Sequence, residues 1–80
     1  METEQPQIEI RFLNGEDSLE LERLAQRDSA TLPPQPLLGG IVDGELVAAY
    51  SLPSRRSIAD PFRPTAEITA LLAQWARRLR

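Results

Sequence analysis

The chain has 80 residues, of which 41% are apolar and four are aromatic, and its formal net charge is −3 at pH 7. It contains no cysteine, no histidine and no lysine. These absences exclude disulfides, zinc, haem or iron–sulfur sites held by Cys or His, Ser-His-Asp triads, cysteine nucleophiles and lysine Schiff bases. The length fits one small domain, and a domain of this size buries only ~60–65% of its unfolded surface.

No apolar run approaches the ~18–20 residues that a membrane span needs, and the acidic start METEQPQ does not resemble a secretory signal peptide. We therefore expect a cytoplasmic protein without a membrane partner. Residues 1–40 carry a net charge of −5, whereas residues 41–80 carry +2. Because the net charge of the chain as a whole is negative, we do not expect it to bind nucleic acid.

The N-terminal region predicts a short flexible tail followed by a strand. Residues 1–6 are polar and contain a proline, so the single domain is expected to span residues 7–80. Apolar residues then alternate with polar ones at Ile8, Ile10 and Phe12. This period of two is typical of a strand with one buried face.

A helix is predicted to begin at Asn14, where Asp17 can reach back to complete a capping box. One face of this helix is marked by Ser18, Leu21, Leu24, Ala25 and Asp28. The helix should end near residues 28–30, because three prolines follow, and residues 29–36 should form a loop.

The clearest local signal is a hairpin, in which two apolar runs are joined by Asp43-Gly44. This pair is typical of a two-residue type I′ turn. Continuing the pairing from that turn places Leu38 opposite Ala49, Gly39 opposite Ala48 and Gly40 opposite Val47. The glycines permit a close approach by another group. After a turn at residues 53–56, a short third strand is predicted at residues 57–59.

Residues 60–64 contain two prolines and should be irregular, after which Thr65 is expected to cap a long helix. Its apolar stripe is formed by Ile68, Leu71, Leu72, Trp75 and Leu79. The element order is then β-α-β-β-β-α. The predicted fold is α+β, an antiparallel meander sheet packed by two helices.

This order, with this hairpin, resembles the N-terminal half of the GNAT acetyltransferase fold over roughly residues 8–79. The residues that carry the resemblance are Ile10-Arg11, Leu24-Ala25, Asp28-Ser29, the hairpin residues 42–47 and the segment 58–63. The chain also looks like short actinobacterial GNAT-like proteins of unassigned function, through its segment 59–67. The resemblance implies that residues 58–63 lie where the fourth GNAT strand runs into its acetyl-CoA loop.

The corresponding loop departs from the GNAT pattern. GNAT enzymes carry Arg/Gln-x-x-Gly-x-Gly/Ala there, whereas this chain has Arg63-Pro64-Thr65-Ala66-Glu67-Ile68. No glycine allows the backbone to approach a pyrophosphate, Pro64 lacks an N–H donor, and Glu67 adds a negative charge. The strands that would complete the family's pantetheine slot are also missing from the sequence. An autonomous acetyltransferase is therefore not expected.

The best candidate for an anion or coenzyme A site is Arg63 with the helix start at Thr65 and Ala66. In the alternative interpretation, Thr65 caps the helix and Arg63 lies on the surface or pairs with Asp60. If the site does bind acetyl-CoA, a second chain would have to complete it.

Other polar groups have ordinary structural explanations. Arg55 and Arg56 could contact an acidic partner but also fit a solvated turn. The arginines at 77, 78 and 80 suit the helix dipole, and Trp75 is predicted to pack in the core rather than to stack on a base. We expect no metal at the four acids Glu16, Asp17, Glu20 and Glu22, because acidic residues are common at a helix start. We also name no catalytic residue. Tyr50 is predicted to be a strand residue opposite Leu37.

These observations favour a non-catalytic GNAT-like module without a cofactor. The third strand of the meander should be a sheet edge, and edges of this kind are normally blocked or paired. A domain with about 20 inward residues is only marginally stable by itself, so we expect it to form a homodimer or to bind a partner protein. The contact would be made across that edge or through the C-terminal helix that carries Trp75. The alternatives are an acyl-CoA-binding or acetyltransferase-related protein and a regulatory subunit of another protein.

Overall fold

The computed structural model describes residues 7–28 and 31–79. The elements, in chain order, are β1 (Ile8–Phe12), a single 3-10 turn (Gly15–Asp17), α1 (Ser18–Arg27), β2 (Leu37–Val42), β3 (Glu45–Ser51), β4 (Ser57–Ala59) and α2 (Ala66–Arg78). The predicted α+β class and the order β-α-β-β-β-α are confirmed. The tail predicted at residues 1–6 lies outside the described residues, as does Arg80.

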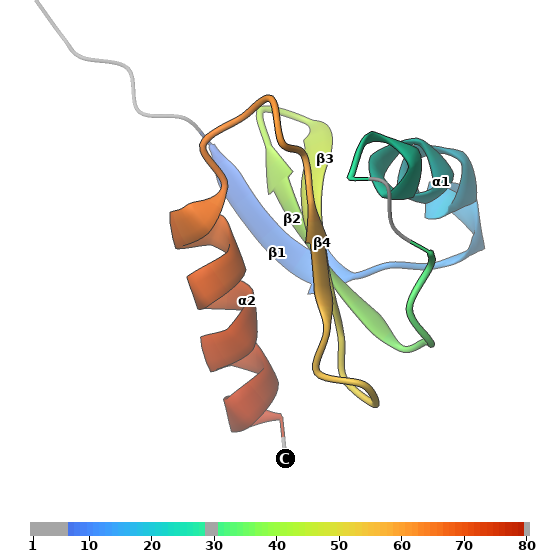
Figure 1. The fold of residues 1–80 in the computed structure, drawn as a ribbon. Helices are drawn as coiled ribbons and strands as arrows, with labels where there is room; N and C mark the ends of the chain where they lie inside the picture. Colours follow the sequence, from blue (N-terminus) through green and yellow to red (C-terminus); the bar gives the residue numbers. More distant parts are fainter. Residues whose placement is uncertain (1–6, 29–30, 80) are drawn as a thin grey trace, which may run out of the picture.

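The four strands form one antiparallel sheet in the order β1-β2-β3-β4. The helices lie on opposite faces of this sheet, α2 on the left and α1 on the right in Figure 1. One apolar cluster joins α1 to its face and contains Leu21, Leu24, Ala25, Leu37, Ile41, Leu46, Ala49 and Ile58. The other joins α2 to the opposite face and contains Leu38, Val47, Ala48, Ile68, Leu72 and Ala76. Both faces of the central strands are therefore buried.

The predicted capping box at the beginning of the first helical segment is confirmed. Asn14 Oδ1 accepts a hydrogen bond from Glu16 N at 2.8 Å, and Asn14 N donates to Asp17 Oδ2 at 2.8 Å. Arg11 of β1 also donates to both carboxylate oxygens of Asp17, at 2.9 Å each. These bonds fix the end of β1 to the start of the helical segment.

The Asp43-Gly44 turn is confirmed, and both residues have positive φ, 51° and 84°, as a type I′ turn requires. The predicted register is correct beside the turn, where Val42 lies opposite Glu45, but it is wrong farther away. The pairing shifts between Gly40 and Ile41, so that Gly40 lies opposite Ala48 and not Val47. This bulge turns Val47 and Ala48 toward the same helix, α2.

Leu38 and Gly39 are displaced by the same shift. They lie opposite Tyr50 and Ala49, not opposite Ala49 and Ala48 as predicted. Tyr50 therefore faces Leu38 rather than Leu37.

The prediction that Trp75 packs in the core is wrong. α2 contacts the sheet through Ile68, Leu72 and Ala76, which are spaced four residues apart and lie on one line along the helix. Trp75 lies beside this line and is 43% exposed, and Leu79 is exposed as well.

Candidate functional site

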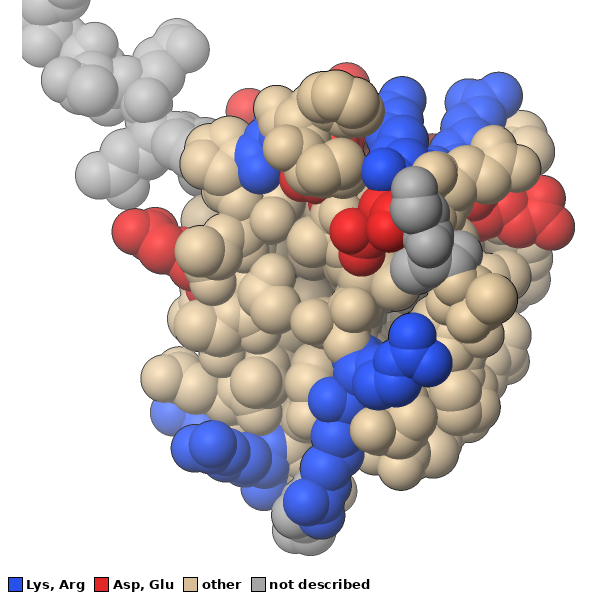
Figure 2. All heavy atoms as spheres, viewed as in Figure 1, with Lys and Arg blue, Asp and Glu red and all other residues tan. Residues whose placement is uncertain are grey.

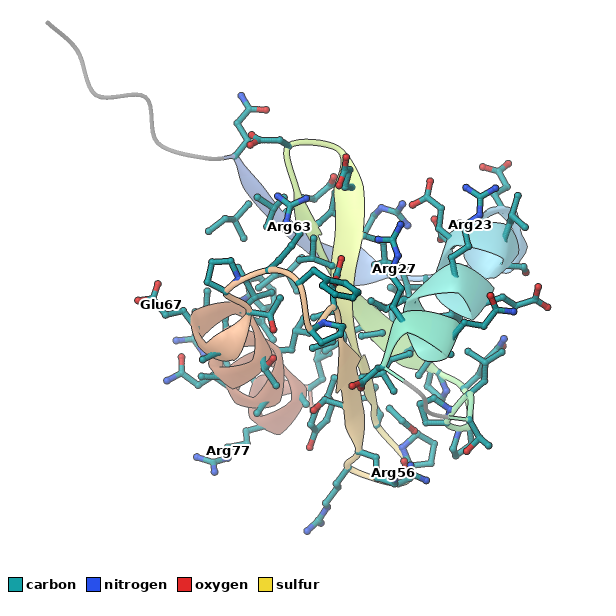
Figure 3. The ribbon with its side chains drawn as sticks, turned by 45° about the horizontal axis from the view of Figure 1, so that its top comes forward. Arg23, Arg27, Arg56, Arg63, Glu67 and Arg77 are labelled. Atoms are coloured by element: carbon teal, nitrogen blue, oxygen red, sulfur yellow. The ribbon has the colours of Figure 1, made fainter. Side chains whose placement is uncertain are left out.

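A cavity of about 660 Å³ lies between the beginning of α2 and the near ends of β1, β2 and β3. Its apolar wall is formed by Ile8, Val42, Val47 and Ile68. The candidate residues predicted from the sequence, Arg63, Thr65 and Ala66, all line this cavity. The structure therefore brings the three together, and Figure 3 shows Arg63 beside the hairpin and Glu67 on the first turn of α2.

The charge of Arg63 is already balanced. Its Nη1 atom lies 2.6 Å from Oε2 of Glu45, the first residue of β3. The predicted partner, Asp60, is instead paired with Arg27 at 3.1 Å, so that part of the prediction is wrong. Two further carboxylates, Asp43 and Glu67, line the same cavity. This arrangement disfavours a pyrophosphate at the site.

Thr65 occupies the N-cap position of α2, but its side chain makes no capping hydrogen bond. Its carbonyl accepts bonds from both the backbone N–H and the side-chain hydroxyl of Thr69, at 2.9 and 2.8 Å. The prediction that the Thr65 side chain caps the helix is therefore wrong. The first N–H groups of α2 remain uncapped by Thr65 at the edge of the cavity.

A second feature is the apolar side of β1. Ile8 and Phe12 are each 47% exposed, and Ile10 between them is half-buried. Their cross-strand neighbours are Val42, Gly40 and Leu38, which places these three side chains on the α2 face of the sheet. Because α2 packs over β2 and β3, it leaves this side of β1 incompletely covered.

Among residues 7–28 and 31–79, no strand pairs with the outer edge of β1. Two hydrogen bonds flank its pairing with β2, from Asp43 N to Gln7 O and from Leu13 N to Leu37 O, each 2.9 Å. Since antiparallel residues alternate between bonded and non-bonded pairs, the odd-numbered residues face β2, and Ile8, Ile10 and Phe12 direct their N–H and C=O groups outward. We call this edge, with those three side chains, the β1 surface.

The opposite edge is short and partly covered. The prediction that residues 57–59 form an edge strand is confirmed, since β4 has three residues and pairs with β3 alone. However, Asp28 at the end of α1 accepts a hydrogen bond from Ala59 N at 3.2 Å. The structure thus leaves β1 as the longer and more accessible edge.

The remaining sequence candidates do not form a chemical site. Figure 2 shows arginine gathered at the lower end of the molecule, where the β3–β4 turn carries Arg55 and Arg56 and α2 ends with Arg77 and Arg78. Tyr50 borders a small hollow with Leu52, Ala76 and Leu79. Within the described residues, no group of three or more acidic side chains could hold a metal ion.

No protein-family model, no curated protein and no solved structure matches this chain. In the part of the chain that the structure describes, no helix is both long and apolar enough to cross a membrane.

Proposed function

We propose that this chain is a small non-catalytic module that binds a second copy of itself through the β1 surface. The observation that carries the proposal is the combination of an open five-residue edge with an apolar side that α2 leaves half-exposed. Strand edges of this kind add a further strand from another chain, with backbone hydrogen bonds supplying affinity.

The GNAT-like character is part of the same proposal. It is supported by the element order and by the Asp43-Gly44 hairpin. The absence of catalysis is supported by the loop at residues 63–68, which lacks glycine, and by the ion pair that balances Arg63. Burial of the β1 surface would also stabilise a domain whose own core is thin.

Light scattering during size-exclusion chromatography tests the proposal. At about 100 µM we expect a mass of twice the 9.0 kDa chain. Phe12→Lys, which introduces a charge into the β1 surface, should give a monomer. The matched control is Leu19→Lys, because Leu19 is 60% exposed and belongs to α1, which packs on the opposite face of the sheet from Ile10. A wild-type chain that remains monomeric at this concentration would overturn the proposal.

A second candidate function is acyl-CoA binding at the cavity. It is favoured by the apolar wall, which suits an acyl chain, and by Arg63, which lines the same cavity. If 1 mM acetyl-CoA bound with a dissociation constant of ~10 µM, it would stabilise the fold by ~2.7 kcal/mol. A thermal-shift measurement should then show a rise of several degrees that Arg63→Gln removes and Arg56→Gln retains. No shift in the wild-type chain would exclude this function at that affinity.

A further inference from the structure

The sequence of β1 specifies how two copies would pair. We propose that the β1 strands of two copies lie antiparallel with Ile10 opposite Ile10, so that Glu9 of each copy faces Arg11 of the other. This register rests on the proposed self-association of the β1 surface and gives its geometry.

The backbone restricts the choice of register. In each copy the outward groups belong to Ile8, Ile10 and Phe12, so an antiparallel pair must place even-numbered residues opposite even-numbered residues. Three such registers overlap most of the strand. They bring Ile10 opposite Ile10, Glu9 opposite Glu9, or Arg11 opposite Arg11.

Charge separates these three registers. The second and third registers place like charges directly opposite each other, which destabilises an antiparallel pair. The first register places Glu9 of each copy opposite Arg11 of the other. It therefore creates two opposite-charge pairs, which are related by the twofold axis between the copies. Arg11 keeps its bidentate bond to Asp17, and its Nε atom lies 3.8 Å from Oε2 of Glu9 in its own strand. Even so, 40% of the Arg11 side chain remains exposed and can also meet Glu9 of the other copy.

The apolar side agrees with the same register. It places Ile8 of one copy opposite Phe12 of the other, twice, with the two Ile10 side chains at the centre. Aromatic and β-branched residues stabilise antiparallel sheets when they lie directly opposite each other. The pattern apolar–acidic–apolar–basic–apolar is therefore complementary to its own reverse over all five residues of β1.

Existing contacts leave the backbone bonds available. Arg11 Nη1 donates to the outward-facing carbonyl of Phe12 at 3.2 Å. A carbonyl oxygen has two lone pairs, so Phe12 O can also accept from Ile8 N of the second copy. Phe12 of that copy would then lie beside Ile8, which forms part of the cavity wall.

Cysteine cross-linking tests the register directly, because the chain has no cysteine of its own. Opposed residues in bonded antiparallel pairs have Cα atoms about 5.5 Å apart, which a disulfide can span. Under diamide, which accepts the two electrons and two protons, Ile10→Cys should link to itself. Ile8→Cys and Phe12→Cys should each fail alone and should link when they are mixed.

The shifted registers give different results. Glu9→Cys linking efficiently to itself, or Ile8→Cys linking without Phe12→Cys, would overturn this register while leaving the dimer intact. Ile8 and Phe12 are both half-exposed, so the mixed experiment remains decisive even if Ile10→Cys fails to fold. A wild-type chain of monomer mass would instead overturn the proposed function itself.

A charge reversal provides an independent measurement. Glu9→Arg replaces both opposite-charge pairs with pairs of arginines and should raise the dimer dissociation constant about tenfold. The matched control is Glu22→Arg, an equal charge change on the exposed side of α1. With Glu9 opposite Glu9 or with Arg11 opposite Arg11, the same substitution would leave the number of like-charge pairs unchanged. An unchanged constant in a dimeric protein would therefore overturn the register.

Discussion

At the scale of single residues, Arg11 and Asp17 connect the end of β1 with the beginning of the helical segment. The hydrogen bond from Arg11, and next to it the bond from Asn14 N, lowers the pKa of Asp17 from 3.8 to about 2. The same pair raises the pKa of Arg11. A carboxyl whose pKa is lower in the folded state stabilises the fold above its unfolded pKa, and the contribution disappears as the pH falls toward 2.

We expect Asp17→Asn to lower the free energy of unfolding at pH 7 by roughly 2 kcal/mol, because Arg11 loses its charged partner. The difference from the wild-type chain should shrink below pH 4 and become small near pH 2. Urea denaturation at fixed protein concentration, at pH 7 and pH 2.5, measures both values. The control is Glu16→Gln, an exposed neighbour in the same turn. An equal difference at the two pH values would contradict the assignment.

At the scale of elements, periodicity, the Asn14 capping box and the prolines predicted the helices and strands correctly, but the register of β3 beyond the bulge could not be predicted. Alternation normally fixes register, because one strand face is apolar and the other polar. Here β2 reads LLGGIV and is buried on both faces, so a shift by one residue produces no visible conflict in the sequence. The bulge opposite Gly40 therefore left no signal.

The candidate site shows the same division between local and long-range information. The position of Arg63, Thr65 and Ala66 at a helix start could be predicted from the prolines and the apolar stripe. The ion pair with Glu45 could not, because it joins residues 18 apart in the sequence that only the folded chain brings together. The exposure of the β1 side chains also depends on which strands α2 covers, and the apolar stripe of α2 does not show which strands these are.

Gly40 determines how closely α2 packs on the sheet. A Cβ atom there would overlap the Ile68 side chain of α2, and one at Gly39 would overlap Leu13 on the other face. We expect Gly40→Ala to destabilise the fold by about 1–3 kcal/mol, because α2 must move away from β2. Chemical denaturation checks this value. Gly15→Ala is the control, since its Cβ would meet nothing within 4 Å, and equal losses in both variants would argue against close packing at Gly40.

At the scale of the whole molecule, the two edges of the sheet differ in length, covering and composition. β4 is short and one of its N–H groups is bound by Asp28, whereas β1 is longer, apolar on one side and open. An 80-residue domain gains much from covering such an edge, because its own core is small. Self-association and stability should therefore be coupled in this protein.

This coupling makes thermal unfolding depend on concentration. While the dimer predominates, a tenfold rise in protein concentration stabilises it by about 1.4 kcal/mol, which raises the unfolding midpoint by about 4 °C for two chains of this size. We expect circular dichroism melts of the wild-type chain at about 10 and 100 µM to show this shift. Phe12→Lys should melt at a lower temperature that does not change with concentration, while Leu19→Lys should behave like the wild-type chain. A wild-type midpoint that is independent of concentration would mean that β1 remains unpaired and that the single domain supplies all of the stability.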